Sequence, residues 1–252
     1  MDRLPKSRAV GFITARPIAH RGLHDLAKGV VENTASAFAA AIAAGYAIEC
    51  DLQLTRDGEA VVFHDDHLER LTEGHGLVKD HSTAEMQQLT IRNSTDRVQT
   101  LQQLLAQVRG QVPLVIELKS HWDGDEQLAK RAVEELTSYA GPFCLMSFDP
   151  DVIAAVRRIA PHIIRGIVAE RATDSYYSSL PLPKQTELRT FSHVSRTSPD
   201  FVSFYFEELP WAPITALRAN GMPIITWTIR SPQQAVMALR CSDQITFEGF
   251  TA

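Results

Sequence analysis

Carboxylates and a lysine stand one residue apart in two strand-like runs of this chain. In the first run Glu49 and Asp51 flank a cysteine, and in the second Glu117 and Lys119 flank a leucine. Side chains two positions apart in a strand point to the same face, so each pair would share one side of a sheet. A buried cluster of three carboxylates is unstable unless a cation neutralises it. The spacing therefore predicts a metal site with Glu49, Asp51 and Glu117 as ligands.

All the donor atoms in this set are oxygens, which suit a hard divalent cation such as Mg²⁺, Ca²⁺ or Mn²⁺ better than zinc. One bound cation would contact a non-bridging phosphate oxygen and offset the charge that develops in a transition state. The alternative interpretation is that Glu49 and Asp51 are ordinary exposed carboxylates at a strand end. Three residues at matching strand ends, His20, His64 and Lys119, favour the metal site.

Two of the nine histidines, His20 and His64, differ from the rest because each follows a strand-like apolar run. Imidazole is the side chain best suited to proton transfer near neutral pH. Hydrolysis of a phosphodiester needs one group to deprotonate the attacking oxygen and another to protonate the leaving alcohol. The pattern predicts that His20 and His64 form this acid/base pair, without assigning either role. Six others are interpreted as surface or core residues: His24, His67, His75, His81, His162 and His193.

Arg21 and Lys119 are the candidates for phosphate binding. Arginine offers a planar fork to two phosphate oxygens, and lysine offers a mobile point charge. Both could also pair with the metal-binding carboxylates, and the two roles are compatible. Aromatic residues follow other strands on the same rim. Phe148 and Tyr205 are weaker candidates for a pocket wall, and Trp122 fits either the rim or the surface.

The spacing of apolar residues predicts the elements that carry these side chains. Strand-like runs occur at 17–22, 46–54, 114–119, 143–147, 163–168, 200–204, 223–228 and 244–247. Helical periodicity occurs at 35–42, 126–138, 150–159, 213–219 and 232–239, and more weakly at 184–194. Strands that alternate with helices form a parallel sheet, and eight such units fit a closed (β/α)₈ barrel. An open doubly wound sheet is the alternative, but no glycine-rich phosphate loop follows the first strand.

Local signals indicate where the early elements begin and end. The first helix is expected to have Asn33 as its N-cap and to stop at Gly45. The Arg-Asp-Gly turn at 56–58 should lead by hairpin chemistry into a second extended run at 60–64.

The segment 65–99 is polar and less regular than the rest of the chain. It contains one capping box, in which Ser82 precedes Glu85 by three residues. We interpret it as an insertion over one rim of the barrel, after the second barrel strand. A similar cap at Thr100 restarts the regular alternation. Residues 1–252 are otherwise expected to form a single domain, because barrels of about this length commonly fold as one unit.

Composition narrows the class of protein. The 252 residues are 44% hydrophobic and 22% charged, which is enough to form a large core. The net charge of −5 gives no electrostatic footprint for nucleic acid. Three cysteines cannot pair completely, and the N-terminal segment has neither an export signal nor a membrane span. We therefore expect reduced thiols, a cytoplasmic location and no stable membrane association, while the oligomeric state stays open.

Five short motifs together resemble the glycerophosphodiester phosphodiesterase family. They are His20-Arg21, Glu32-Asn33-Thr34, Glu49-Cys50-Asp51, His64-Asp65 and Glu117-Leu118-Lys119, with further matches at 55–58 and 227–228. The resemblance runs from about residue 17 to residue 247. It implies a phospholipase C-like phosphodiesterase barrel that hydrolyses small-molecule glycerophosphodiesters to glycerol 3-phosphate and an alcohol.

The same resemblance implies roles that spacing alone leaves open. Glu32 would join the metal ligands, and Trp227 would line the substrate pocket, although a core tryptophan fits the sequence equally well. The two histidines would act as a pair, through a cyclic phosphate formed by the neighbouring glycerol hydroxyl. Two positions depart from the family pattern. Cys50 replaces an aliphatic residue, and Glu248 follows Ile-Thr-Phe where the family usually reads Ile-Thr-Asp.

Two other functions fit the same residues less well. Phospholipase D-type toxins and phosphatidylinositol-cleaving phospholipases have related sites, and lysophospholipids could also be substrates. The toxins act at a membrane after export and usually carry an apolar loop, whereas the insertion of this chain is polar. A barrel that binds phosphodiesters without cleaving them would be expected to lack a histidine or a carboxylate of the set. The headgroup alcohol and the preferred metal stay open.

Overall fold

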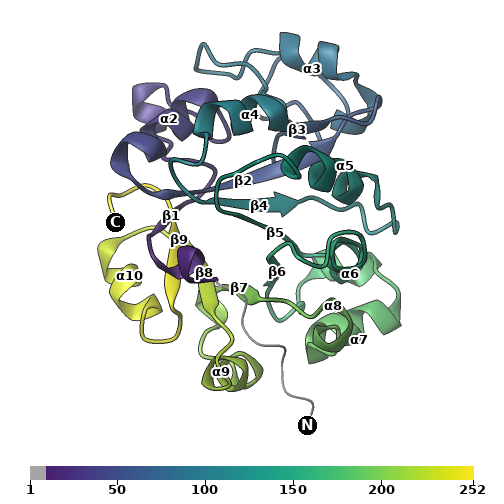
Figure 1. Ribbon diagram of the computed structural model, residues 1–252, viewed down its shortest axis with the longest axis vertical. Helices are drawn as coiled ribbons and strands as arrows, with labels where there is room; N and C mark the ends of the chain where they lie inside the picture. The colour runs from purple at the N-terminus through teal and green to yellow at the C-terminus, as the bar shows by residue number, and fades with distance from the viewer. Residues whose placement is uncertain (1–9) are drawn as a thin grey trace.

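The computed structural model describes residues 10–252, whose strands close into a barrel (Figure 1). The strands are β1 (Ile18–Ala19), β2 (Ala47–Leu54), β3 (Ala60–Val62), β4 (Leu114–Leu118), β5 (Phe143–Ser147), β6 (Arg165–Ala169), β7 (Phe201–Tyr205), β8 (Ile224–Ile229) and β9 (Gln244–Phe247). All except β3 pair in parallel, and β1 pairs with both β2 and β9, which closes the ring. The eight parallel strands and the helices between them confirm the predicted (β/α)₈ barrel.

The helices lie around the outside of the strands (Figure 1). They are α1 (Gly11–Thr14), α2 (Ala35–Ala44), α3 (Thr83–Gln88), α4 (Leu101–Val108), α5 (Gln127–Leu136), α6 (Pro150–Ile159), α7 (Leu182–Thr190), α8 (Val194–Thr197), α9 (Ala212–Ala219) and α10 (Pro232–Ala238). Short 3₁₀ turns occur at η1 (Leu26–Lys28), η2 (Val78–Asp80), η3 (Ser175–Ser179) and η4 (Phe206–Glu208). The weak pattern at 184–194 corresponds to α7, which ends where Phe191 adopts the left-handed conformation, and to the start of α8.

The N-cap of α2 is Thr34, so the prediction that Asn33 caps this helix is wrong. The Thr34 hydroxyl accepts a hydrogen bond from the backbone N–H of Ala37. Asn33 instead has a positive φ of 55°, and its amide donates to Asp51 at 2.9 Å. The helix stops at Gly45 with a φ of 75°, as expected. Asn33 therefore belongs to the surroundings of the carboxylates rather than to the end of the helix.

Strand β3 pairs antiparallel with the end of β2, which confirms the predicted hairpin. The segment 65–99 then leaves the barrel and returns at α4, and it lies at the top of the view, beyond α4, with α3 outermost (Figure 1). Both capping boxes are present, at Ser82 and at Thr100. Although the segment is polar in composition, it packs an apolar cluster of its own against the hairpin. Its members from this segment are Leu68, Leu71, Val78, Met86, Ile91 and Val98.

The register between β2 and β4 decides how the predicted metal ligands meet. Asp51 stands opposite Glu117, and Glu49 stands opposite Val115. Since side chains alternate along a strand, Glu49 and Asp51 face the same side as Glu117. The intervening Cys50 and Ile116 are fully buried on the other face, in the layer between strands and helices. The pleat therefore brings all three carboxylates inside the barrel.

The N-terminal segment, for which neither an export signal nor a membrane span was predicted, lies partly outside the described residues. Within 10–252 we find no helix with the length and apolar character needed to cross a bilayer. Cys50 and Cys144 are buried and Cys241 is half-buried, and all three are free thiols, which agrees with the prediction from cysteine number.

Candidate active site

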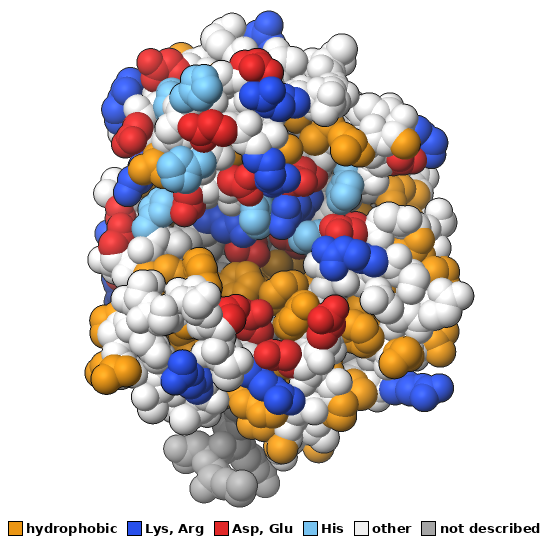
Figure 2. All heavy atoms as spheres, turned by 180° about the vertical axis from the view of Figure 1, so that it is seen from behind, with side chains coloured by type: hydrophobic (Ala, Val, Ile, Leu, Met, Phe, Trp, Pro, Cys, Tyr) orange, Lys and Arg blue, Asp and Glu red, His pale blue; other side chains and the backbone are white. Residues whose placement is uncertain are grey.

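Side chains from the C-terminal ends of the barrel strands converge on one cavity of about 110 Å³, here called the central cavity. Its lining residues are His20, Arg21, Glu49, Asp51, His64, Glu117, Lys119, Met146, Phe148, Val168, Ser203, Trp227 and Thr246. Every predicted site residue except Glu32 is among them. Figure 2 shows a hollow on this face, with basic and histidine side chains gathered along one side and hydrophobic side chains at its floor.

The three carboxylates of the central cavity form a buried cluster. Glu49, Asp51 and Glu117 each place one oxygen within 4.8 Å of the others. Their exposed fractions are 2%, 1% and 7%. Burial raises the pKa of Glu49 and of Glu117, and the neighbouring carboxylates raise it further. Burial has the same tendency at Asp51, but the positive charges of Lys119 and nearby groups hold its pKa below the ordinary value.

This cluster fits a divalent cation. Burial and carboxylate repulsion raise the pKa of Glu49 and Glu117, and at Glu117 the contact with Lys119 offsets the rise only in part. A bound cation would relieve the remaining penalty. The donors are all carboxylate oxygens, the ligands that hard cations prefer. Glu49, Asp51 and Glu117 are therefore the residues that would hold a metal.

The two cationic side chains lie against the same carboxylates. Lys119 Nζ is 2.9 Å from Asp51 Oδ1 and 2.7 Å from Glu117 Oε1. Arg21 Nε is 3.5 Å from Asp51 Oδ2, and the backbone N–H of Arg21 donates to Glu49 at 2.8 Å. Both side chains also line the central cavity. Contact with the carboxylates and contact with a bound anion are thus compatible, as the sequence suggested.

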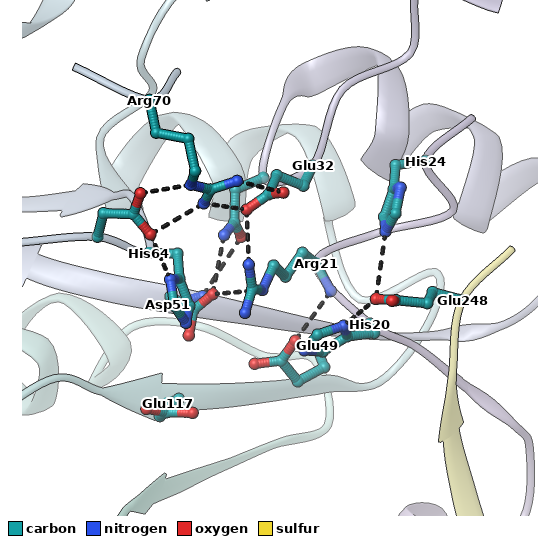
Figure 3. A network of polar contacts seen from close by, with 12 residues as sticks. His20, Arg21, His24, Glu32, Glu49, Asp51, His64, Arg70, Glu117 and Glu248 are labelled. Carbon is teal, nitrogen blue, oxygen red and sulfur yellow. Dashed lines mark hydrogen bonds and ion pairs between the residues drawn. The ribbon is translucent and has the colours of Figure 1, made fainter. Parts of the chain in front are cut away.

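Glu32 lies outside the carboxylate cluster. Its oxygens accept from Arg21 Nη1 at 2.6 Å and from both terminal nitrogens of Arg70 at 2.7 and 2.9 Å (Figure 3). Burial tends to raise the pKa of Glu32, but these arginines lower it to about 2. A carboxylate neutralised by two guanidinium groups has little need of a metal. In this structure Glu32 orients Arg21 instead.

His64 is positioned by a carboxylate on its Nδ1 atom. Asp65 Oδ1 lies 2.7 Å from that nitrogen, and Asp65 is held in turn by Arg70 from the insertion. Since the carboxylate accepts the proton on Nδ1, Nε2 is left to face the cavity. Sequence reasoning identified His64-Asp65 as a motif, but it missed Arg70, which no local pattern distinguishes from other surface arginines.

His20 has a matching arrangement built from distant parts of the chain. Its Nδ1 atom is 2.5 Å from Glu248 Oε2 (Figure 3). Arg230 donates to Glu248 Oε1 at 2.8 Å. His24 Nε2 lies 3.7 Å from the same Glu248 oxygen. Burial lowers the pKa of His20, only partly offset by its bond to Glu248. Glu248 was noted only as a departure from the family pattern, and that departure was the available signal.

Asn33 supports the cluster from the other side. Its side-chain amide donates to Asp51 Oδ2 at 2.9 Å, while its carbonyl oxygen accepts from the backbone N–H of Asp51 at 3.4 Å. One carboxylate oxygen of Asp51 is therefore fixed by an amide and the other by Lys119. The unusual backbone of Asn33, with φ at 55°, is what turns the amide toward the strand.

An aromatic wall closes the central cavity opposite the carboxylates. Trp227 packs edge-on against Phe148, with ring centroids 5.4 Å apart, and against Tyr205 at 5.1 Å. Its indole N–H donates to the carbonyl of Ser203 at 3.2 Å. Trp227 thus both packs against neighbours and lines the cavity, so the two interpretations of this residue hold together.

A second cavity of about 270 Å³ adjoins the first and is here called the aromatic cavity. It shares His64, Glu117, Lys119 and Phe148 with the central cavity. Its remaining lining residues are Leu118, Ser120, Trp122, Ser147, Glu170, Tyr176 and Tyr177. Sequence analysis left Trp122 unassigned and overlooked Glu170 and the tyrosine pair.

Comparison with known proteins gives one consistent result. A profile described as the glycerophosphoryl diester phosphodiesterase family matches residues 20–243. A glycerophosphodiester phosphodiesterase of Caldanaerobacter subterraneus is 30% identical over 223 residues, which is 84% of each chain. A putative glycerophosphodiester phosphodiesterase of Bacillus subtilis is 29% identical over 231 residues, covering 86% of this chain and 87% of its own.

Solved structures agree on the fold. An Oleispira antarctica phosphodiesterase, determined in complex with the product sn-glycerol-3-phosphate, superposes with a TM-score of 0.77 at 22% identity. The match covers 94% of both chains. A putative glycerophosphoryl diester phosphodiesterase from Silicibacter pomeroyi gives a TM-score of 0.74 at 24% identity, over 92% of this chain and 89% of its own.

Proposed function

We propose a specific mechanism for this chain, which belongs to the glycerophosphoryl diester phosphodiesterase family and is a glycerophosphodiester phosphodiesterase. The reaction is the metal-dependent hydrolysis of a small glycerophosphodiester to sn-glycerol 3-phosphate and an alcohol. One observation carries the proposal. A buried carboxylate cluster, two carboxylate-oriented histidines and two cationic side chains line a single cavity at the C-terminal ends of the barrel strands.

The substrate phosphate would bind between the cationic side chains and the metal site. Glu49, Asp51 and Glu117 would hold a divalent cation, which would supply Lewis acidity for the phosphate. Arg21 offers its guanidinium to the phosphate, and Glu32 holds that side chain in place from behind. Lys119 adds a second positive charge at the floor of the cavity. The Oleispira neighbour with its bound glycerol phosphate supports a phosphate of this size in the cavity.

The surroundings of the two histidines support different roles for them. His20 lines the central cavity but not the aromatic cavity. Burial lowers its pKa, so its neutral form predominates at neutral pH. With Nδ1–H donated to Glu248, its Nε2 lone pair is free to accept a proton. We assign His20 as the general base that deprotonates either water or the neighbouring glycerol hydroxyl.

His64 would then be the general acid. It lines both cavities, so the alcohol that departs from phosphorus toward the aromatic cavity passes beside it. Asp65 and Arg70 fix the ring with Nδ1–H toward Asp65. In the doubly protonated form of His64, Nε2 carries the second proton and would donate it to the leaving oxygen. Trp227 would form the wall against which the glycerol moiety packs.

The free thiols support a reducing, cytoplasmic compartment.

The test is a turnover assay with product identification. Purified protein is incubated with soluble glycerophosphodiesters, before and after EDTA, and then with Mg²⁺, Mn²⁺ or Ca²⁺ restored. We expect sn-glycerol 3-phosphate and free alcohol, abolished by the chelator and recovered with the cation. Full activity in exhaustively chelated enzyme contradicts the metal role. Release of phosphocholine, or cleavage only of diacyl lipid in liposomes, contradicts the proposed reaction.

A further inference from the structure

The aromatic cavity begins where the central cavity ends. His64, Glu117, Lys119 and Phe148 line both, so a molecule whose phosphate lies in the central cavity extends directly into the aromatic one. The aromatic cavity lies on the side of His64, which faces the leaving oxygen in the proposed mechanism. Its occupant would therefore be the headgroup that the enzyme releases.

Three aromatic rings surround this space from different directions. The rings of Trp122 and Tyr177 are nearly perpendicular at 79°, with centroids 6.2 Å apart. Those of Tyr176 and Tyr177 meet at 89° with centroids 5.1 Å apart. The indole N–H of Trp122 donates to the hydroxyl of Tyr176 at 3.2 Å, which links the loop after β4 to η3. Each of these edge-to-face contacts covers one ring face with the edge of its neighbour. Tyr177 is only 3% exposed and thus supports the more exposed rings of Trp122 and Tyr176 from behind.

Carboxylates without cationic partners stand beside these rings. Glu170 lines the cavity, and burial raises its pKa. A hydrogen bond with the Tyr177 hydroxyl offsets part of this rise, whereas the negative charges of Asp174 and Glu208 add to it. Within residues 10–252, no Lys, Arg or His side chain forms an ion pair with any of the three. Figure 2 shows acidic side chains on the side of the hollow away from the basic and histidine groups. A cation in this cavity would supply the missing partner.

We propose that the aromatic cavity binds a quaternary ammonium group, so that the preferred substrate of the proposed reaction is glycerophosphocholine. The ring faces of Trp122 and Tyr176 attract a cation, and Glu170 adds opposite charge. A trimethylammonium group has no N–H donor and loses little by leaving water for an apolar lining. Ethanolamine would bring a strongly hydrated ammonium with three donors, and glycerol or inositol would bring hydroxyls that the rings cannot satisfy.

The charges of the two cavities match such a zwitterion. Arg21 lines only the central cavity, where the phosphate would lie, and Glu170 lines only the aromatic cavity, where the cation would lie. Lys119 lines both cavities, but its charge is paired with Asp51 and Glu117. The inference rests on the proposed reaction, since the headgroup occupies this space only if the phosphate binds in the central cavity.

The test compares kcat/KM for three soluble diesters that differ only in headgroup: choline, ethanolamine and glycerol. We expect the wild-type enzyme to favour the choline diester by roughly tenfold over the glycerol diester. Tyr176→Leu and Trp122→Leu should each lower the choline value by roughly five- to thirtyfold and reduce the choline preference accordingly. Tyr176→Phe, which keeps the ring face, should retain most of that preference.

Controls separate binding from folding. Tyr176 is 62% exposed, so Tyr176→Leu should melt like the wild type. Tyr139→Leu makes the same chemical change before β5, at the opposite rim, and should leave the headgroup ratio unchanged. Glu170→Gln should lower kcat/KM for the choline diester and reduce the ratio of this value to kcat/KM for the glycerol diester. An equal loss for all three diesters, or no choline preference in the wild type, overturns the inference while the proposed hydrolysis stands.

A binding readout keeps the inference testable if hydrolysis itself is not found. Tetramethylammonium chloride, titrated into the full chain, should quench indole fluorescence, and the quenching should be lost in Trp122→Leu but kept in Trp227→Phe. Ammonium chloride and sodium chloride at the same ionic strength are the controls, because neither contains a quaternary ammonium ion. Quenching that is identical for all salts, or unchanged in Trp122→Leu, overturns the quaternary ammonium site.

Discussion

The central and aromatic cavities adjoin but are built in opposite ways. The residues of the central cavity lie on barrel strands or within two residues of their ends, except His64, which follows the hairpin strand β3. The β2–β4 register sets the positions of its carboxylates. The aromatic cavity takes Trp122 from a loop and Tyr176 and Tyr177 from a 3₁₀ turn. Strand ends hold groups rigidly, whereas loops accept changes of sequence. Under the proposed reaction, the barrel strands would hold the residues that act on the phosphate, and the loops would contact the headgroup.

The two cavities also differ in how their charges are compensated. In the central cavity each cation contacts a carboxylate, and each histidine has a carboxylate on Nδ1. In the aromatic cavity Glu170 has no cationic partner within the described chain. The cations and histidines of the central cavity are thus held in fixed orientations, whereas Glu170 has no cationic side chain beside it. Substitutions should therefore affect turnover of all substrates in one cavity and selectivity in the other.

The largest expected effect is loss of the metal carboxylates. Asp51→Asn and Glu117→Gln should each reduce turnover of every glycerophosphodiester to background, because the phosphate loses its electrophile. Calorimetric titration should show weakened Mg²⁺ or Mn²⁺ binding in parallel. Glu134→Gln, an exposed carboxylate change on α5, is the matched control. If the loss of turnover in these carboxylate variants depended on the headgroup, the proposed separation of roles between the two cavities would be wrong.

Next in size are the two histidines. His20→Ala and His64→Ala should each lower kcat by about a hundredfold or more, the usual range for a positioned acid or base. A diester of p-nitrophenol separates their roles, because p-nitrophenolate leaves without protonation. With that substrate His64→Ala should recover most of its activity and His20→Ala should not. His67→Ala, at an exposed site, is the control. Recovery in His20→Ala instead would reverse the assignment.

Many residues of the central cavity could be predicted from the sequence, because the signals that identify them lie within single strands. Alternation places Glu49, Asp51 and Glu117 on one face, and the strand ends carry His20 and His64. Their supporting residues could not be predicted in the same way. Glu248 reaches His20 across 228 positions because β1 pairs with β9, with Ala19 opposite Phe247. Only closure of the barrel creates that contact.

The aromatic cavity was missed for a related reason. Trp122 and Tyr176 are 54 positions apart and belong to segments without regular periodicity. Nothing in their spacing distinguishes them from surface aromatics, since loop conformation alone brings them together. The misassigned cap at Asn33 has a local cause. Asn and Thr are both common N-cap residues. Here the side chain of Asn33 is bonded to Asp51, and Thr34 accepts the hydrogen bond that caps α2.

A smaller effect is expected at Glu248, which orients His20 without contacting the reacting atoms. Glu248→Gln should lower kcat by roughly tenfold, because the amide holds the Nδ1 proton less firmly and stabilises the imidazolium less. KM should change little, and Glu248→Asp should recover part of the loss. Combined with His20→Ala, the substitution should cost nothing further, since both act on the same proton transfer. Additive losses in the double variant would assign Glu248 a separate role.

The smallest expected effect is on thermal stability, where bound Mg²⁺ should raise Tm through the carboxylates of the central cavity and not through the aromatic cavity. In the metal-free protein the raised pKa values of Glu49 and Glu117 mean that the folded state binds protons more tightly than the unfolded state. Their contribution to stability is therefore present below the ordinary carboxyl pKa of about 4.3 and is lost as pH rises through the folded values. A cation replaces those protons, so Mg²⁺ should raise Tm more at about pH 8 than at about pH 5. Thermal melts with and without Mg²⁺ measure this, with Tyr176→Leu keeping the full gain and Glu117→Gln losing most of it. A gain that is equal at both pH values would show that the cation does not compete with protons for these carboxylates.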